Sequence, residues 1–432
     1  MNEQFLTYIW FQKLFSVTQK TVDGESVEII DVGQPNTDGG PDVFNAKIKI
    51  GNTLWAGNVE FHQKSSDWIR HGHVTDEAYN SVILHVVLEV DVPILATDGR
   101  IIPQMKLSFP LNLYDNYTML CVKRQFIACE TAIHQVPELV LHSWLDRLLA
   151  ERLEQKTAVI TQMLEQSQHN WEEVFYVILA RNFGFSTNAL AFELLAKSLP
   201  LMVLAKHKSN LLQLEALLFG QAGMLHDDMC QDSYFLDLKR EYNFLKAKYR
   251  LAPIDLSLWK LLRLRPANFP TIRLAQFAQL IYGSSKLFSK ILETSDYKSL
   301  QLLFNCTPSS YWRTHYVFGK SADMKTLRLS KTSKNTLLIN TVVPFLFCYG
   351  RLRNQFTYEE RALDLLNEIT AEKNSIVSGF AQCGVRVNSA SDSQALIQLK
   401  RAYCDVHKCL QCRVAKFLMS ENGKQEHSFI CH

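Results

Sequence analysis

No apolar stretch in this chain of 432 residues approaches the roughly 18–20 residues that a membrane-spanning helix needs. The first residues, MNEQFLTYIWFQKLF, also lack the basic segment and continuous apolar core of a secretion signal. The net charge is only +3, and 47% of the residues are hydrophobic, which excludes a disordered or fibrous protein. We therefore expect a globular cytoplasmic protein without membrane segments.

Several catalytic signatures are also missing. The chain contains no Walker phosphate loop, dinucleotide fingerprint, HExxH pair or nucleophile elbow. Most of the ten cysteines stand alone in apolar stretches such as PFLFCYG, a pattern typical of reduced, buried thiols. Any chemistry must therefore come from residues that lie outside these common motifs.

Charge and residue pattern divide the chain near residue 120. Residues 1–120 carry 8 basic and 15 acidic residues, whereas the remainder carries 38 and 28. Opposite charge balances of this kind suggest separate domains. We predict an α/β domain over residues 1–120 and a helical domain over 121–432, ending in a cysteine-rich segment.

The first domain shows a helix followed by strands. Residues 3–15 place apolar side chains at helical spacing, and VEIIDVG, PDVFNAKIKI and TLWAGNVEFH read as an antiparallel meander. A loop and a short helix follow, and SVILHVVLEV is apolar enough for a central strand. A weaker hairpin is expected across 93–107, with Asp98-Gly99 as its turn. The predicted order is therefore helix, three strands, helix, strand.

From about residue 136 the pattern is helical. The long segment ELVLHSWLDRLLAERLEQKTAVITQMLEQ has leucines three and four residues apart, and further helical segments follow it. Together the two patterns predict an α+β protein.

The densest group of potential ligands and proton carriers lies between residues 38 and 85. Some of its members have ordinary structural alternatives. His85 suits a hydrogen-bonded core histidine, Asp67 and Asp76 suit helix caps, and loop histidines such as His71 and His73 often serve no site. The group consists of Asp38, Asp42, Glu60, His62, Asp67, His71, His73, Asp76 and His85.

Asp42 and Glu60 lie on the two arms of a predicted hairpin that turns near Gly51-Asn52. A two-residue turn would place these acids on opposite faces, whereas a three-residue turn or a bulge would place Asp42, Glu60 and His62 on one face. The apolar alternation does not choose between the two registers. If the acids do converge, a divalent cation is the usual means of keeping such a buried pair ionised.

The order of elements, with Pro41-Asp42 opening one strand and Glu60 on the next, resembles the α-β-β-β-α-β core of the PD-(D/E)xK nuclease-like superfamily. The resemblance implies that Asp42 and Glu60 hold Mg²⁺ or Mn²⁺. A lysine two residues after the second acid assists water in that superfamily, but here His62 occupies this position and Lys64 follows two residues later. The resemblance covers residues 1–110 and leaves open whether His62 or Lys64 has substituted or catalysis has been lost.

Longer segments resemble a bacterial family found mainly in Bacteroidetes, the domain of unknown function 2851. The segments include GGPDVFNAKI, GNVEFHQKSSDW, HGHVTDEAYNSVILHVV, LLFGQAGML and SDSQALIQLKRAYC with CLQC. This resemblance extends over nearly the whole chain. It implies one architecture and no established activity.

A second candidate metal site lies near the C-terminus. Cys404, Cys409 and Cys412 form C-x4-C-x2-C, and His407, Cys383 or Cys431 could supply the fourth ligand. This spacing suits a structural zinc site, or alternatively an iron–sulfur loop. In the simpler alternative, the thiols face the core of two amphipathic helices.

Basic residues of the second half are interleaved with aromatics, as a nucleic-acid-binding surface requires. The alternative is a solvated helix face with core aromatics. The candidates for nucleic-acid contact are Arg240, Lys246, Lys248, Arg250, Arg263 and Arg265.

These features predict a metal-dependent phosphodiesterase that acts on nucleic acid. Asp42 and Glu60 would bind Mg²⁺ or Mn²⁺, and His62 or Lys64 would assist the water. One alternative is a catalytically inactive nuclease-like binding or scaffold protein. Another is a hydrolase that uses His62, His71, His73 and His85 around a transition metal.

Overall fold

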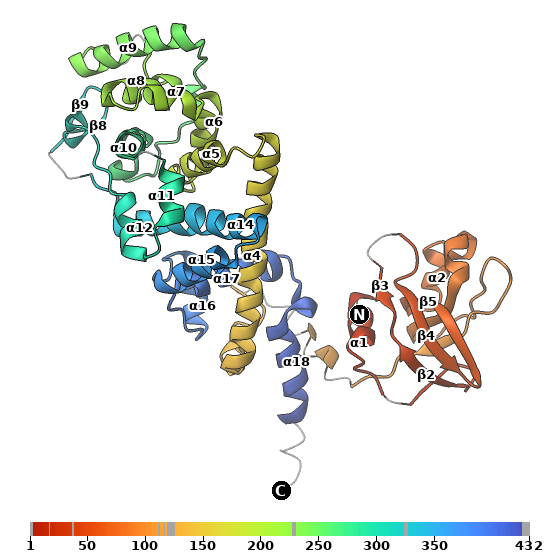
Figure 1. Ribbon diagram of the computed structural model, residues 1–432. Coiled ribbons are helices and arrows are strands. Elements are labelled where there is room, and N and C mark those ends of the chain that lie inside the picture. Colours follow the sequence, from red (N-terminus) through yellow and green to blue (C-terminus); the bar gives the residue numbers. More distant parts are fainter. Residues whose placement is uncertain are drawn as a thin grey trace. The chain divides into compact units, whose positions relative to one another are not determined.

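The computed structural model describes residues 3–16, 18–36, 39–110, 113–115, 117–118, 126–226, 230–284, 286–323 and 327–425. The chain divides into two units, Met1–Leu141 with Arg401–His432, and His142–Lys400 (Figure 1). This division differs from the expected ranges of 1–120 and 121–432. The C-terminal segment joins the first unit because Leu410 and Met419 pack into the hydrophobic core of that unit. Asp38 lies outside the described residues.

A mixed sheet forms the centre of the first unit, with β3 paired to β4 and the other strands in the order β1-β2-β4-β5-β6-β7. Strands β2, β4 and β5 are antiparallel, whereas β6 runs parallel to both β5 and β7. The strands are β1 (Gln19–Lys20), β2 (Ser26–Asp31), β3 (Gln34–Pro35), β4 (Val43–Ile50), β5 (Thr53–Lys64), β6 (Val82–Glu89) and β7 (Gln104–Lys106).

Helix α1 (Glu3–Phe11) precedes the sheet, and α2 (Asp67–Arg70) lies between β5 and β6. The predicted order of helix, three strands, helix and strand is therefore present, with β1, β3 and β7 added to it. Two 3-10 turns, η1 (His73–Thr75) and η2 (Glu77–Ser81), complete the connection that makes β6 parallel to β5. The weak hairpin expected over 93–107 is reduced to a bridge between Leu95 and Ile101, and then to β7.

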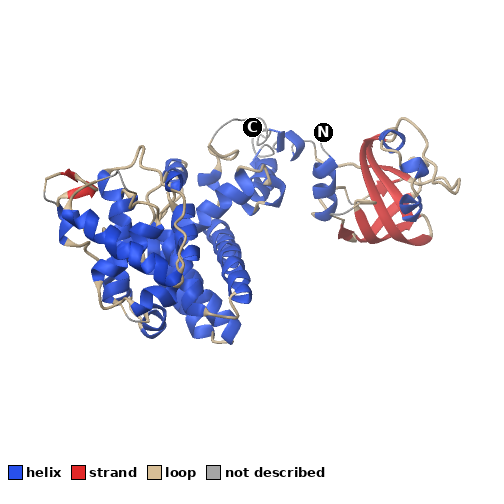
Figure 2. Ribbon diagram, turned by 90° about the horizontal axis from the view of Figure 1, so that it is seen from above, coloured by secondary structure: helices blue, strands red, loops and turns tan. Residues whose placement is uncertain are grey.

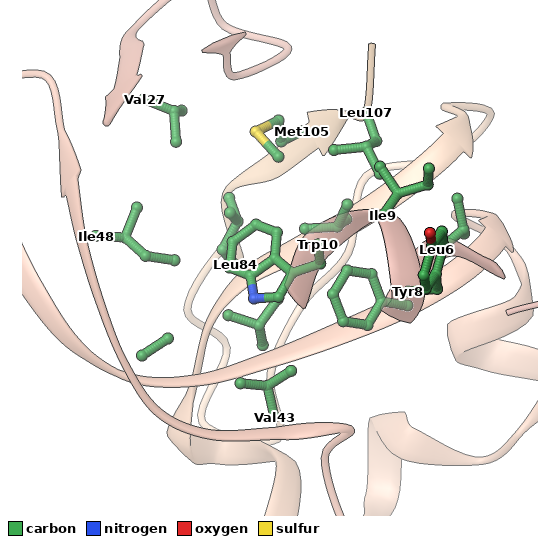
Figure 3. Packing of buried hydrophobic residues seen from close by; sticks show 14 of the residues in the cluster. Leu6, Tyr8, Ile9, Trp10, Val27, Val43, Ile48, Leu84, Met105 and Leu107 are labelled. Carbon is green, nitrogen blue, oxygen red and sulfur yellow. The ribbon is translucent and has the colours of Figure 1, made fainter. Parts of the chain in front are cut away.

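The first unit has separate apolar clusters against its sheet. One cluster receives Phe5, Ile9 and Trp10 from α1 and includes residues of β2, β4, β5, β6 and β7 (Figure 3). The indole nitrogen of Trp10 donates to Val32 O at 2.9 Å, so this large side chain is buried without leaving its polar atom unpaired. A smaller cluster contains Trp68, Tyr79 and Val82 together with Ile94, Ala96 and Ile102.

A β-bulge sets the register between β4 and β5. In an antiparallel pair the numbers of two facing residues add up to a constant as long as the register is unchanged. Near the turn Ile50 pairs with Thr53, which gives 103, but at the other end Val43 pairs with Val59, which gives 102. The register shifts between Val43 and Ala46, where Asn45 has a left-handed φ of 56°. Val43 and Ala46 therefore both enter the same apolar cluster, although strict alternation would place them on opposite faces. Of the two hairpin registers that the sequence allows, the bulge selects the one that places Asp42 and Glu60 on the same face.

The second unit is almost entirely helical (Figure 2). No helix in the described parts of the chain is long and apolar enough to cross a membrane. From residue 138 onward, the described α-helices are α4 (Glu138–Gln166), α5 (Trp171–Phe183), α6 (Ala189–Ser198), α7 (Leu201–Lys206), α8 (Leu211–Gln221), α9 (Ser233–Tyr249), α10 (Pro270–Gly283), α11 (Leu287–Glu293), α12 (Tyr297–Leu303), α13 (Lys331–Leu337), α14 (Val343–Arg353), α15 (Phe356–Glu368), α16 (Ser375–Gln382), α17 (Ala390–Leu399) and, in the first unit, α18 (Arg413–Gln425).

Short elements join these helices. They are the 3-10 turns η3 (Ile133–Gln135), η4 (Leu256–Leu258), η5 (Pro266–Asn268), η6 (Ser310–Arg313) and η9 (Cys409–Gln411), the π-helical turns η7 (Leu338–Val342) and η8 (Lys400–Cys404), and the strand pair β8 (His315–Val317) and β9 (Lys320–Ser321). The α+β class predicted from the sequence is present. The likeness to the nuclease superfamily remains a prediction.

Candidate metal centre

Asp42 and Glu60 are held side by side at the bulged end of the hairpin. The backbone N–H of Asp42 donates to Glu60 Oε2 at 3.0 Å, and the N–H of Phe61 donates to Asp42 Oδ2 at 3.1 Å. Each carboxylate is thus bonded to the opposite strand. This reciprocal arrangement requires the register that the bulge creates.

Three histidines converge beside Glu60. One ring nitrogen from each of His62, His71 and His73 lies within 4.8 Å of the other two. His62 lies on β5 two residues after Glu60, so it shares the Glu60 face of the strand, while His71 and His73 follow α2 on both sides of Gly72. Gly72 has a left-handed φ of 79°, which turns the chain between the two histidines.

The distances within this group match those between ligands of one ion. His62 Nε2 lies 3.1 Å from His71 Nδ1, whereas two nitrogens bound to one tetrahedral zinc ion lie about 3.3 Å apart. Glu60 Oε1 lies 3.7 Å from His62 Nε2 and 3.5 Å from His73 Nε2. His73 Nε2 is buried and has no hydrogen-bond partner, as expected of a nitrogen that faces a ligand position.

His85 supports His62 from the neighbouring strand. His85 Nε2 lies 2.9 Å from His62 Nδ1, and both side chains are buried. If His62 Nδ1 carries the proton and donates it to His85, His62 Nε2 keeps a lone pair that faces His71 and Glu60. The expectation that His85 is a buried, hydrogen-bonded histidine is therefore confirmed, and its partner is a member of the candidate centre.

Aromatic rings close one side of the group. Tyr79 stacks on His73 with 3.8 Å between ring centroids, and Trp68 makes edge contacts with His62, His73 and His85. Trp68 is fully buried. These rings limit the positions that His62 and His73 can adopt.

Burial shifts the protonation equilibria of the centre. Desolvation, and then the charge of Glu60, raises the pKa of Asp42 to about 7. The pKa of His62 is lowered to about 2, mainly by desolvation and next by the charge of His85. The pKa of His85 is lowered to about 3, mainly by desolvation and next by the charge of His73. The two buried imidazoles are therefore neutral near pH 7, which is the protonation state that binds metals.

Other predicted residues lie outside this group. Lys64 is exposed at the end of β5, and its Nζ lies 3.1 Å from Glu89 Oε1. Asp76 caps η2 by accepting from the N–H of Ala78, as the capping alternative predicts. The same alternative is wrong for Asp67, because its carboxylate accepts from the N–H of Lys64, which precedes the helix, and also pairs with Arg70.

One nearby acid was not singled out from the sequence. Glu3 of α1 interacts electrostatically with His71, Asp67 and Glu60, and burial is the first cause of its raised pKa. Glu3 also contributes to the raised pKa of Asp42. The sequence places Glu3 at the start of an amphipathic helix, which does not indicate a role in a metal site. Its position beside the acids depends on how α1 packs against the strands.

The C-terminal cysteines do not belong to the converging group. Cys404 ends η8, Cys409 begins η9 and Cys412 is buried, and none of the three forms a disulfide within the described part of the chain. Cys383 lies in the second unit, where its Sγ donates to Gly379 O at 3.1 Å, and His407 is exposed with a φ of 54°. Cys431 and His432 lie outside the described residues. The zinc site therefore remains a prediction.

The expected nucleic-acid contacts fall on α9 and on the loop before η5. Lys246, Lys248 and Arg250 are exposed at the end of α9, whereas Arg240 pairs with Asp237 at 2.9 Å. Lys248 lies over the rings of Phe244 and Tyr249, so basic and aromatic groups alternate there. Arg263 and Arg265 are exposed in the loop.

Most of the chain matches one protein family. The model of the family described as a protein of unknown function, DUF2851, matches residues 3–375, so the chain belongs to that family. No curated protein and no solved structure matches the chain. The match includes the candidate metal centre and ends before the segments SDSQALIQLKRAYC and CLQC.

Proposed function

We propose that the first unit is a divalent-metal-dependent hydrolase whose metal is held by His62, His71 and His73. The observation that carries this proposal is the convergence of three ring nitrogens within 4.8 Å beside the carboxylate of Glu60. Glu60 completes the ligand set through Oε1, because its Oε2 is occupied by the backbone of Asp42.

The donor set favours a transition metal over Mg²⁺. Imidazole nitrogen is a ligand that zinc and iron accept readily, whereas Mg²⁺ prefers oxygen. The expectation of Mg²⁺ or Mn²⁺ rested on Asp42 and Glu60 and the nuclease resemblance, while the alternative with His62, His71, His73 and His85 implied a transition metal. With three histidines beside Glu60, we propose Zn²⁺ first and Mn²⁺ second.

The protein residues around the metal have distinct roles in this proposal. A bound divalent metal would polarise a phosphoryl or carbonyl oxygen and make water more acidic. One carboxylate oxygen of Asp42 accepts a hydrogen bond from the N–H of Phe61, so the other oxygen can accept a proton from the attacking water. His85 keeps His62 in the tautomer that binds metal and is a positioning residue.

We propose a phosphodiester of nucleic acid as the substrate. Basic and aromatic residues at the end of α9 form a surface that we name the α9 basic surface. It consists of Phe244, Lys246, Lys248, Tyr249 and Arg250. Its lysines and arginine suit phosphate, while the exposed ring of Phe244 can stack on a base. Arg263 and Arg265 are further candidates for phosphate contact.

The first experiment measures metal content and hydrolysis in the full chain. The wild type and the variants His71→Ala and Asp42→Asn are incubated with bis-p-nitrophenyl phosphate, single-stranded DNA and RNA, each with Zn²⁺, Mn²⁺ or Mg²⁺. His71 is exposed, so its replacement should leave the fold intact, and His142→Ala on α4 is the matched exposed control. We expect His71→Ala to lose metal and activity, Asp42→Asn to lose activity, and His142→Ala to behave as the wild type.

One observation favours an inactive nuclease-like binding protein as a second candidate. The lysine that would assist water in the superfamily is absent from the group, because Lys64 pairs with Glu89. Salt-sensitive nucleic-acid binding without cleavage in any metal would support this candidate. A wild type that neither retains metal nor hydrolyses any of these substrates would contradict the hydrolase proposal.

A further inference from the structure

The second unit contains a cavity of about 470 Å³ between α5, α7, α10 and α11. This volume lies within the range of about 300–1,000 Å³ that is usual for small-molecule sites. Its walls are mainly apolar, and the rings of Phe175 and Phe277 are almost fully buried. The main apolar lining residues are Phe175, Leu179, Leu201, Phe277, Leu280 and Leu287.

Most polar side chains that line this cavity are already bonded within the protein. The hydroxyl of Tyr176 donates to Leu199 O at 3.0 Å, and that of Ser284 donates to Leu280 O at 2.6 Å. Ser289 donates to Glu172 Oε1 at 3.3 Å. These groups are therefore poorly suited to reading the edges of a nucleobase or sugar, and the walls favour a hydrocarbon body.

Two lysines line the cavity together with one carboxylate, that of Glu172, which accepts from Ser289. Lys208 and Lys286 line the cavity, and Lys208 also lines an adjoining surface hollow with Lys206. The ammonium of Lys290 lies close enough to Lys208 to lower its pKa, after the larger effect of desolvation. An anion at this place would relieve the repulsion between the two ammonium groups.

We propose that this cavity binds a single-chain amphiphilic anion, with its hydrocarbon chain between α5 and α10 and its carboxylate at Lys208, one of the two lysines of the lining. The apolar walls account for the chain, and Lys208 and Lys286 account for the charge of the head group. This site lies wholly in the second unit and does not depend on the metal centre.

Linear carboxylates of increasing length test the hydrocarbon part. Octanoate, decanoate and dodecanoate are titrated into the full chain by isothermal calorimetry, below the concentrations at which they form micelles. Each added methylene that becomes buried should strengthen binding by about fourfold until the cavity is full. Absence of saturable dodecanoate binding, or affinity independent of chain length, would overturn the proposal.

Two variants test the position of the ligand. Ala205 lines both the cavity and the adjoining hollow and is exposed, so Ala205→Trp should block the entrance without disturbing the core. We expect dodecanoate binding to be lost while the unfolding temperature stays unchanged. Unchanged dodecanoate affinity in a folded Ala205→Trp protein would contradict binding at this cavity.

The head group is tested separately. Lys208→Gln should weaken dodecanoate binding by about fivefold and leave dodecanol binding unchanged, since only the carboxylate uses the ammonium. Lys331→Gln replaces an exposed lysine at the start of α13, is the matched control and should leave dodecanoate binding unchanged. If Lys208→Gln binds dodecanoate as the wild type does, the anionic part of the proposal is wrong.

Discussion

His62 Nδ1 and His85 Nε2 lie 2.9 Å apart on the adjacent parallel strands β5 and β6. The strands pair Glu60 with His85 in register, which brings a histidine 23 residues away beside the candidate ligand His62. His85 is fully buried, and its second ring nitrogen has no hydrogen-bond partner. Its contact with His62 is therefore its clearest polar role.

The first prediction is that His85 sets metal affinity without touching the metal. His85→Ala should weaken Zn²⁺ or Co²⁺ binding by about 10–100-fold, because His62 loses the partner that fixes its tautomer. His85→Gln should restore part of this affinity, since its amide oxygen can accept from His62 Nδ1. Competition with a chromophoric chelator measures both values.

A buried histidine of the second unit is the control for this experiment. His207 bonds to Gln213 and Tyr249, so His207→Gln should affect stability but leave metal affinity unchanged. Equal metal affinity in the wild type and His85→Ala would show that His85 only packs.

The second prediction concerns metal removal. A metal present at 100 times its dissociation constant should raise the free energy of unfolding of the metal-binding unit by about 2.7 kcal/mol. Treatment with a chelator should therefore lower the unfolding temperature, and Zn²⁺ should restore it. Calorimetry of the wild type and His71→Ala measures the effect, which the variant should lack. A chelator-dependent shift of equal size in His71→Ala would place the metal elsewhere.

The third prediction concerns the bulge at Asn45. Asn45→Val should cost about 1–3 kcal/mol, because a β-branched residue is strained at a φ of 56°. It should also weaken metal binding, since the bulge places Asp42 opposite Glu60. Urea unfolding and metal titration measure the two effects.

Two further variants separate strain from strand propensity. Asn45→Gly should keep the register and the metal affinity, because glycine adopts this conformation freely. Lys47→Val adds the same side chain at an exposed position of β4 and should be close to neutral. A Lys47→Val protein that loses as much stability as Asn45→Val would refute the explanation by strain.

The fourth prediction concerns pH and Glu215 of α8. Burial raises the pKa of Glu215 from 4.5 to about 7, and one of its oxygens has no hydrogen-bond partner. As pH rises, the carboxyl of Glu215 ionises at a lower pH in the unfolded chain than in the folded protein. The contribution of Glu215 to the free energy of unfolding is therefore fully present below about pH 4.5 and is lost as pH approaches and passes 7. Glu215→Gln should therefore become more stable relative to the wild type by up to about 3 kcal/mol over this window.

Urea unfolding at several pH values measures this difference. Glu165→Gln, at an exposed position of α4, is the control and should show no comparable trend. A difference between Glu215→Gln and the wild type that stays constant from pH 4.5 to 8 would show that the folded protein tolerates ionised Glu215.

Much of the candidate centre could be recognised from the sequence. Glu60 and His62 share a face of any strand because strand residues alternate, and Gly72 between two histidines indicates a turn. Lys64 obeys the same alternation, yet the strand has reached its exposed end there and Glu89 pairs with the ammonium. Strand alternation predicts which face of the sheet a side chain lies on but not how deeply it is buried. It therefore could not distinguish the exposed Lys64 from the buried His62.

Periodicity and turn composition act over a few residues, so the sequence was enough to predict the main strands and helices. It did not predict β1 or β3, and it predicted a hairpin over 93–107 where the structure has a bridge and β7. Three features became visible only in the folded protein: the bulge at Asn45, the parallel pairing that brings His85 to His62, and the approach of Glu3 to the acids. Each of these depends on packing between residues that are distant along the chain. The sequence left the hairpin with two registers, and the apolar cluster that buries both Val43 and Ala46 selects the one in which Asp42 faces Glu60.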